Sequence, residues 1–249
     1  MNRLWAVTLI ATALLFSADG ALSKPCMPAE TGAAVVSSVQ DGRTFKLTDG
    51  REIRLAGIET AGRSADALRR LVEGQTIGLP AGSVTDRYGR LVAFAFLADA
   101  RRSVQQVLLE QGEALVSARI GDKSCVEALF AAEKAARAAR RGLWADPNFA
   151  PLSSENLAGL EAARGRFALV EGKVLSVRES GATVYMNFGR RWTRDFTVTV
   201  LKRQQRTFTA AGLDVKQLEG RRVRVRGTIE RRGGPIIDAT APEQIEPID

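Results

Sequence analysis

Two arginines, a glutamate and a threonine carry the chemistry that the sequence offers most directly. Arg54, Glu59 and Thr60 are close together in the chain, and Arg90 follows within the run Asp86 to Arg90. Planar guanidinium groups donate paired hydrogen bonds to phosphate oxygens, on which negative charge spreads in the transition state of phosphodiester cleavage. These residue types therefore indicate phosphate chemistry, although a single arginine at a strand end is more often solvated or in a surface ion pair.

The segment 41–62 positions three of these residues. Two alternating apolar runs flank Asp49-Gly50, a dipeptide that favours a tight hairpin turn. The second predicted strand of this hairpin carries Arg54 and leads to Glu59 and Thr60. A Tyr-Gly turn in the segment 86–90 then presents Arg90.

The surrounding segments predict further strands and helices. Half-buried strands are expected at 33–47, 75–79 and 91–97, and helices at 64–72, 104–112 and 124–141, the last of which stops at Gly142. By periodicity alone, this part of the chain is a small β-barrel with helices.

Five ordered segments resemble the staphylococcal-nuclease-like (thermonuclease) domain over about residues 33–144. They are DGRTFKL, IRLAGIETA, DRYGRLVAFAFL, VQQVLLEQGEALV and AEKAARAARRGLW. The resemblance implies a five-stranded barrel of the OB type with helices and a calcium-assisted nuclease site. In such a site two arginines bind phosphate, a glutamate activates water, and two aspartates and a threonine carbonyl help to hold the ion.

Matched by position, Arg54 and Arg90 take the places of the two phosphate-binding arginines. Thr60 matches the threonine, and Glu59 stands where the second aspartate is expected, so the resemblance implies Glu59 and Thr60 as ligands of Ca²⁺.

Two departures argue against calcium-dependent hydrolysis. Arg43 occupies the place of the first aspartate, which reverses the charge at an ion ligand, and Gly62 occupies the place of the catalytic glutamate. A general base typically contributes about 10² to 10⁴ in rate. Asp41, Asp66 and Asp86 are the carboxylates that remain as substitutes.

Residues 1–23 resemble a secretory signal peptide, with a short basic start, an apolar stretch and a small-residue region. We expect export to the periplasm or the exterior, with cleavage near Gly20 or Ser23. The alternative is an uncleaved anchor, but the apolar run is shorter than the ~20 residues that span a bilayer. No membrane span is expected in the mature chain.

Cys26 and Cys125 are the only cysteines, and export would place them in an oxidising compartment where they can pair. The chain contains no histidine. A common zinc site and the Ser-His and Cys-His nucleophile pairs are therefore excluded.

The second half of the chain predicts a separate domain. We expect a first domain at 33–145, a Pro- and Ser-containing linker at 146–154, and a domain at 155–249 whose successive short strands loosely resemble a second OB-like antiparallel barrel. The predicted fold class is mainly β with α.

The basic residues of this second half predict contacts with a polyanion. Of the net charge of +8, +5 arises from Pro151 onward, where 17 Lys and Arg face 12 Asp and Glu. Tyr185 and Trp192, interleaved with arginines, could stack on single strands. Arg222, Arg224 and Arg226 alternate with valines, which puts three guanidiniums on one strand face. The alternative is an ordinary barrel with core aromatics and solvated arginines.

The leading hypothesis from the sequence is an exported protein that binds nucleic acid or another polyanion and carries a degenerate phosphodiesterase site. One alternative is an active calcium-dependent nuclease that uses a substitute carboxylate. The other is a non-catalytic envelope protein that binds a protein or an anionic glycan.

Overall fold

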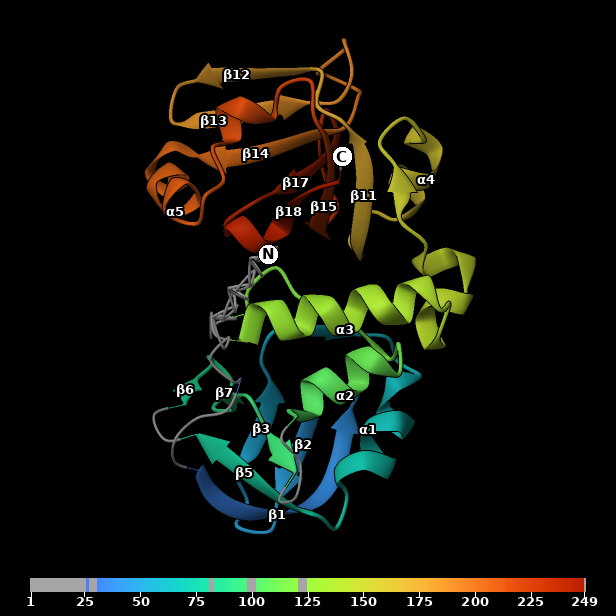
Figure 1. Ribbon diagram of the computed structural model, residues 1–249, viewed down its shortest axis with the longest axis vertical. Helices are drawn as coiled ribbons and strands as arrows, with labels where there is room; N and C mark the ends of the chain where they lie inside the picture. Colours follow the sequence, from blue (N-terminus) through green and yellow to red (C-terminus); the bar gives the residue numbers. More distant parts are fainter. Residues whose placement is uncertain (1–25, 27–30, 81–82, 98–101, 121–124, 249) are drawn as a thin grey trace, which may run out of the picture.

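The protein forms two bodies, each with its own hydrophobic core, in the computed structural model, which describes residues 26, 31–80, 83–97, 102–120 and 125–248. In Figure 1 the N-terminal part lies below and the C-terminal part above, and α3 runs along the junction between them. The predicted signal peptide, residues 1–23, lies outside the described residues.

A seven-stranded sheet forms the N-terminal body, with strands in the order β6-β7-β3-β2-β1-β5-β8. These strands are β1 (Thr31–Asp41), β2 (Thr44–Leu47), β3 (Glu52–Leu55), β5 (Thr76–Pro80), β6 (Val84–Thr85), β7 (Leu91–Ala93) and β8 (Phe96–Leu97). Strands β2 and β3 pair antiparallel around Gly50, whose φ of 91° is the left-handed conformation that the hairpin turn requires. The predicted hairpin is therefore confirmed.

Three helices and a two-stranded ladder complete this body: α1 (Ser64–Val72), α2 (Val104–Glu110), α3 (Val126–Ala138), and β4 (Ile58–Thr60) paired antiparallel with β9 (Ala114–Val116). Alternation along β2 and β3 sends Phe45, Leu47 and Ile53 into the core. The helices coincide with the predicted ones to within a few residues at their ends.

Two sheets form the C-terminal body, with orders β10-β11-β15-β18 and β12-β13-β14-β17-β16. The first contains β10 (Leu152–Ser153), β11 (Phe167–Lys173), β15 (Arg222–Thr228) and β18 (Ile245–Pro247). The second contains β12 (Ser176–Ser180), β13 (Thr183–Asn187), β14 (Thr197–Leu201), β16 (Glu230–Arg232) and β17 (Gly234–Asp238). Helices α4 (Leu157–Ala162) and α5 (Gln205–Ala210) accompany them.

The segment between the two bodies is itself structured. It contains the 3₁₀ turns Gly142–Ala145 and Pro147–Phe149, and β10 then pairs parallel with β11. The end of the predicted linker 146–154 is thus part of the second body's sheet.

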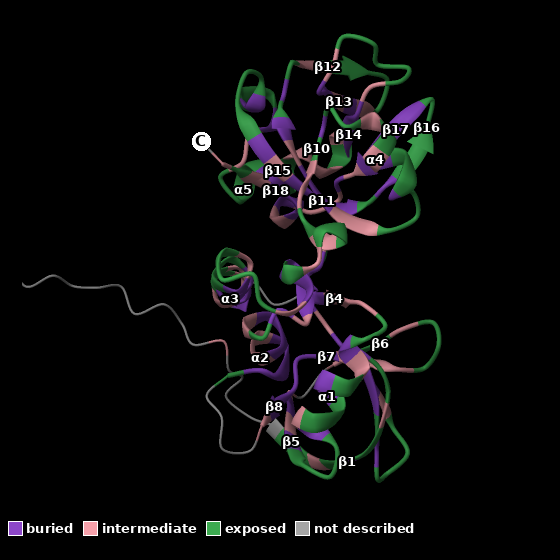
Figure 2. Ribbon diagram, turned by 90° about the vertical axis from the view of Figure 1, so that its right-hand side faces the viewer, coloured by how far each residue is buried: buried purple, intermediate pink, exposed green. Residues whose placement is uncertain are grey.

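The two bodies share a small apolar cluster and a buried ion pair. Trp144 and Leu143 pack with Leu115 from the first body and with Leu169 from the second. Figure 2 shows buried segments in both bodies, with α3 and β4 at the level of the junction. Leu143 and Trp144 thus pack against the first body, and the contact with Leu169 adds an attachment to the second body.

The predicted fold class, mixed α and β with strands predominating, is confirmed. Within the described residues the ladder of the first sheet ends at β6 and β8, and no pairing closes these edges into a barrel. None of the described helices has both the length and the apolar character to cross a membrane.

The predicted disulfide is present. Cys26 and Cys125 are bonded, which attaches Cys26, the first described residue, to the start of α3 across a sequence separation of 99. Cys125 is buried in the first core, so this link lies against packed side chains.

Candidate functional site

The hairpin and β4 bring Arg54, Glu59 and Arg43 to one edge of the first body. Arg54 lies on β3 between the buried Ile53 and Leu55, so strand alternation turns its side chain away from the core. It pairs with Thr44 on β2 and with Val92 on β7, the strand that follows Arg90. The sheet therefore places Arg54 next to the strand that begins directly after Arg90.

Arg43 contacts the group that the resemblance assigns to the metal. Its Nη1 donates a hydrogen bond to the backbone oxygen of Ile58 at 2.9 Å and forms an ion pair with the Glu59 carboxylate. The Ser117 hydroxyl also donates to Glu59, at 3.3 Å. Both side chains of the ion pair are largely shielded, with 22% and 27% exposure. A fixed guanidinium thus neutralises the carboxylate that a divalent ion would need.

Thr60 lies against the turn that carries Arg43. A Cβ atom on Gly42 would approach the Thr60 hydroxyl oxygen to 2.7 Å and the Ser64 Cβ to 2.9 Å. Gly42 is therefore required by this close approach, which brings the β1–β2 turn against β4.

Arg90 is held in place by Asp86. The Arg90 Nε and Nη2 atoms donate to one carboxylate oxygen at 2.9 and 2.7 Å, and the other oxygen accepts from the backbone N–H groups of Tyr88 and Arg90. The hydrogen bond from the Arg90 guanidinium is the main cause that lowers the pKa of Asp86. The Tyr88 ring lies 5.0 Å from the Arg90 guanidinium carbon, so carboxylate and ring together fix its orientation.

Arg54 differs from the other two arginines because its guanidinium has no hydrogen bond or ion pair within the described part of the chain. Burial lowers the pKa of Arg54, and the positive charges of Arg43 and Arg90 lower it further, against the opposing effect of Glu59 and Asp41. A bound anion would relieve this crowding of positive charge. Arg54 is therefore the group in the cluster best placed to take a phosphate oxygen.

The carboxylates that remained as substitutes for the catalytic glutamate are engaged elsewhere. Asp41 accepts from the backbone N–H of Arg43 at 2.8 Å, Asp66 pairs with Arg69 on its own helix, and Asp86 holds Arg90. No group of three or more acidic, histidine or cysteine side chains able to hold a metal occurs among the described residues. Gly62 is exposed, with open space where a Cβ atom would lie.

The prediction that Arg222, Arg224 and Arg226 form a solvent-facing basic surface on β15 is wrong. Arg222 is exposed, but Arg224 pairs with Glu171 and Glu246, and Arg226 is only 1% exposed. The strand belongs to the junction between the bodies, so the face that alternation gave to three arginines is solvated at Arg222, partly shielded at Arg224 and covered at Arg226.

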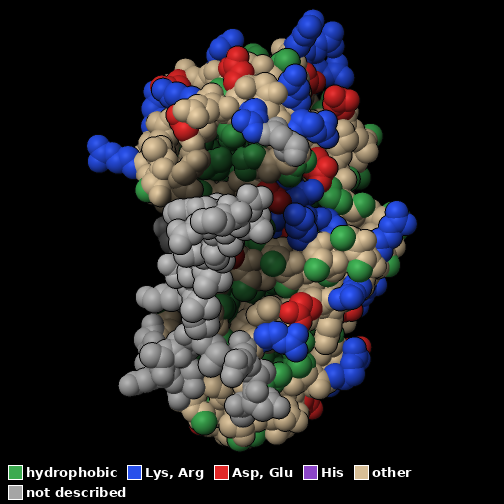
Figure 3. Space-filling view, in the orientation of Figure 1, with side chains coloured by type: hydrophobic (Ala, Val, Ile, Leu, Met, Phe, Trp, Pro, Cys, Tyr) green, Lys and Arg blue, Asp and Glu red, His purple; other side chains and the backbone are tan. Residues whose placement is uncertain are grey.

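Arg226 instead joins the two bodies. Its guanidinium donates to the Glu133 carboxylate on α3 at 2.8 and 3.1 Å and to the Val116 backbone oxygen at 3.0 Å. The Phe130 ring lies 4.4 Å away. Figure 3 shows basic side chains gathered at this level, between the two halves. Sequence reasoning missed Glu133, since its only local signal is the Arg137 one helical turn later, with which it also pairs.

The structure does bring together the two aromatic candidates for nucleic-acid binding. Both Tyr185 and Trp192 line one pocket on the second sheet, together with polar side chains from β13, β14 and β17. The alternation of polar with apolar residues along β13 and β14 was the sequence signal for this polar face, and it was overlooked.

Comparison with known proteins adds one match. Residues 52–146 match the family model described as Staphylococcal nuclease homologue. The stretch from β3 to the turn after α3 is therefore a staphylococcal-nuclease-like domain. The match includes Arg54, Glu59, Gly62 and Arg90, and begins after Arg43. No curated protein matches the chain.

Proposed function

We propose that this protein binds the phosphate backbone of nucleic acid through its nuclease-like domain without a divalent ion, and that it does not hydrolyse it by the family's mechanism. The nuclease-like domain supports a protein of the nuclease family that binds nucleic acid. The observation that carries the finer proposal is the ion pair between Arg43 and Glu59. A calcium-dependent site requires that carboxylate for its ion, and here a side-chain cation already occupies it.

In this proposal Arg54 takes a phosphate oxygen directly, because it is the arginine without an ion pair in the described cluster and lies beside two other cations. Arg90 presents the part of its guanidinium that Asp86 leaves free. Arg43 replaces the positive charge of the ion, but a guanidinium cannot lower the pKa of a bound water as a metal does. Gly62 has no side chain to accept a proton. The site therefore supplies neither a metal ion to activate water nor a general base.

Export to an oxidising compartment belongs to the same proposal. The Cys26–Cys125 disulfide supports it, since such bonds persist in the periplasm and outside the cell. The signal-like segment 1–23 gives the route.

The test compares binding and cleavage of single-stranded DNA by the full chain, with calcium and with a chelator. We expect salt-sensitive binding that the chelator leaves unchanged, no cleavage, and weaker binding in Arg54→Ala and Arg90→Ala. Calcium-dependent cleavage that both variants lose would instead establish an active nuclease. Absence of binding would favour the envelope-protein alternative.

The matched control is Arg51→Ala. Arg51 lies on the same hairpin but is about half exposed and pairs with Asp49 across the turn. The Arg51→Ala substitution removes the same charge as Arg54→Ala. If only the overall charge mattered, the two variants would therefore weaken binding equally. We expect a clearly smaller loss for Arg51→Ala.

A further inference from the structure

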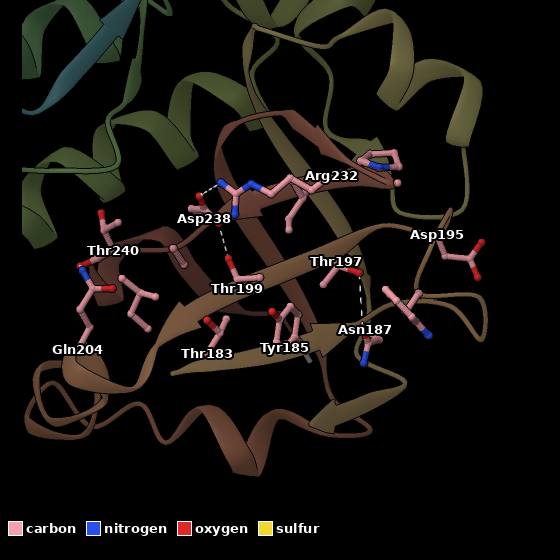
Figure 4. A pocket seen from close by; sticks show the side chains of 16 residues that line it. Thr183, Tyr185, Asn187, Asp195, Thr197, Thr199, Gln204, Arg232, Asp238 and Thr240 are labelled. Carbon is pink, nitrogen blue, oxygen red and sulfur yellow. Dashed lines mark hydrogen bonds and ion pairs between the residues drawn. The ribbon is translucent and has the colours of Figure 1, made fainter. Parts of the chain in front are cut away.

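A pocket of about 310 Å³, lined by both polar and apolar side chains, lies on the outer face of the sheet β12-β13-β14-β17-β16 in the C-terminal body. Figure 4 shows Thr183, Tyr185 and Asn187 along β13, with Thr197 and Thr199 on the neighbouring β14, all projecting into it. Val184 and Met186, the residues between them on β13, belong to the buried core. Strand alternation thus separates an apolar core face from a hydroxyl- and amide-rich pocket face.

The floor of this pocket is polar although it is shielded from solvent. Asn187, Thr197 and Thr199 are 8%, 6% and 6% exposed. The side-chain oxygen of Gln204, which also lines the pocket, is buried and has no hydrogen-bond partner among the described residues. Buried polar atoms normally have partners, so an acceptor without one is available to a ligand's N–H or O–H group.

The charged groups inside the pocket favour a hydrogen-bond donor over an anion. Arg232 is occupied by Asp238 and Glu230, and Asp195 accepts from the Arg191 backbone N–H at 2.7 Å. Burial raises the pKa of Asp238, but hydrogen bonds from Arg232 and Thr199 outweigh it and hold the pKa below its usual value. Asp238 therefore presents an ionised carboxylate with remaining lone pairs, which suits the amino or hydroxyl groups of a neutral ring.

The rim has the opposite character. The loop between β13 and β14 carries Arg190, Arg191 and Arg194, all exposed and without a side-chain partner within the described residues. Trp192 lies among them, lines the pocket and is 71% exposed. An exposed aromatic ring between unpaired arginines matches the stacking and phosphate contacts that hold single strands.

We propose that this pocket takes an unpaired base of a single-stranded nucleic acid. Trp192 and Tyr185 stack on the base, the pocket carboxylates and amides bind its edge, and the rim arginines hold the flanking phosphates. The choice of nucleic acid over an oligosaccharide rests on the function proposed for the first domain. Cytosine is the base used to probe the pocket, because carboxylates accept hydrogen bonds from its amino group.

The experiment measures binding of the full chain to a fluorescent hexamer of deoxycytidine and to an abasic hexamer with the same phosphates. Base stacking contributes about 1–3 kcal/mol, so the deoxycytidine hexamer should bind roughly 5- to 150-fold more tightly. Trp192→Ala should remove most of this difference and leave affinity for the abasic hexamer unchanged. Tyr185→Ala is a second variant, with circular dichroism as the check on folding in both.

Leu175→Ala is the matched control for Trp192→Ala, because Leu175 is an exposed apolar residue of the same body that does not line the pocket. The charge control uses two triple variants of the C-terminal body. In one the three rim arginines are changed to glutamine, and in the other three exposed cations elsewhere on the body are changed to glutamine. These control positions are Arg164, Lys173 and Arg222. The rim variant should bind both hexamers more weakly than the control variant.

Equal binding of the two hexamers by the unaltered chain would overturn the proposal, and so would a base preference that survives Trp192→Ala in folded protein. Binding of chitohexaose that is lost in Trp192→Ala, without a base preference, would assign the pocket to a glycan and overturn it also. Failure of the first-domain proposal has a different signature, because Arg54→Ala would then leave the affinity for the abasic hexamer unchanged.

Discussion

Restoring the two departures in the nuclease-like site should create calcium-dependent hydrolysis. The double variant Arg43→Asp, Gly62→Glu removes the guanidinium from Glu59, adds a carboxylate beside it, and supplies a general base. Gly62 accepts the change without steric cost, because a Cβ atom there meets open space and its φ lies outside the left-handed region. With the Arg43–Glu59 ion pair removed, the site would hold the Glu59 carboxylate and the aspartate introduced at position 43.

The expected sizes follow from the geometry. Loss of the partly shielded Arg43–Glu59 pair should cost about 1 kcal/mol of stability, so the variant should remain folded. A general base contributes about 10² to 10⁴ in rate, so the double variant should exceed Arg43→Asp alone by that factor. Gly62→Glu alone should stay inactive, because Arg43 still occupies the metal's carboxylate.

The assay follows release of a fluorophore from a quenched single-stranded DNA, with calcium and with chelator. Gly62→Gln in the Arg43→Asp background controls for shape without a proton acceptor. Gly32→Glu is the matched charge control, since Gly32 is also exposed and a Cβ atom there would meet no neighbour within 4 Å. A folded, DNA-binding double variant without calcium-dependent activity would refute the reasoning that these two positions block catalysis.

Three further outcomes are expected. Arg226→Ala should lower the free energy of unfolding by up to about 3–5 kcal/mol in urea titrations, because it removes one partner of a buried ion pair and leaves the Glu133 carboxylate with Arg137 as its remaining cation. Arg222→Ala on the same strand should change the free energy of unfolding by less than about 0.5 kcal/mol. Equal effects would contradict the buried junction. Hydrogen bonds from Lys216 and Lys202 lower the pKa of Glu179 from 4.5 to about 2, so its contribution is present above pH 4.5 and is lost as the pH falls toward 2. Glu179→Gln should therefore reduce the loss of stability between pH 5 and pH 3, and an unchanged pH profile would argue against this pairing. Reduction of the disulfide, which spans 99 residues, should cost about 2–5 kcal/mol, as measured by the melting temperature with and without reductant.

The local structure of the candidate site was predictable from the sequence because it depends on nearest neighbours along the chain. Asp49-Gly50 requires a turn, and the alternation of Ile53, Arg54 and Leu55 then decides which side chain faces outward. The order of five segments identified the family, and positional matching located the substitutions at Arg43 and Gly62.

The position of the Arg43 guanidinium, which lies where the resemblance places a metal ion, depends on the tertiary structure. The sequence showed that a guanidinium replaces a carboxylate at position 43, but not that it reaches across to Glu59 and the Ile58 backbone on β4. That contact depends on how closely the β1–β2 turn approaches β4, which Gly42 permits through its contact with Thr60.

The second body shows the same division between local pattern and long-range packing. Alternation correctly placed Arg222, Arg224 and Arg226 on one face of β15, because that face follows from the strand period alone. Whether a face meets water depends on elements distant in sequence, and here α3, with Glu133, covers Arg226 across a separation of 93 residues. The sequence by itself determined most of the elements and the family of the first domain, and it named the two cysteines that can pair. Only the tertiary structure decided which arginines are free to meet a ligand, because the ion-pair partners of Arg43, Arg224 and Arg226 come from other elements of the fold.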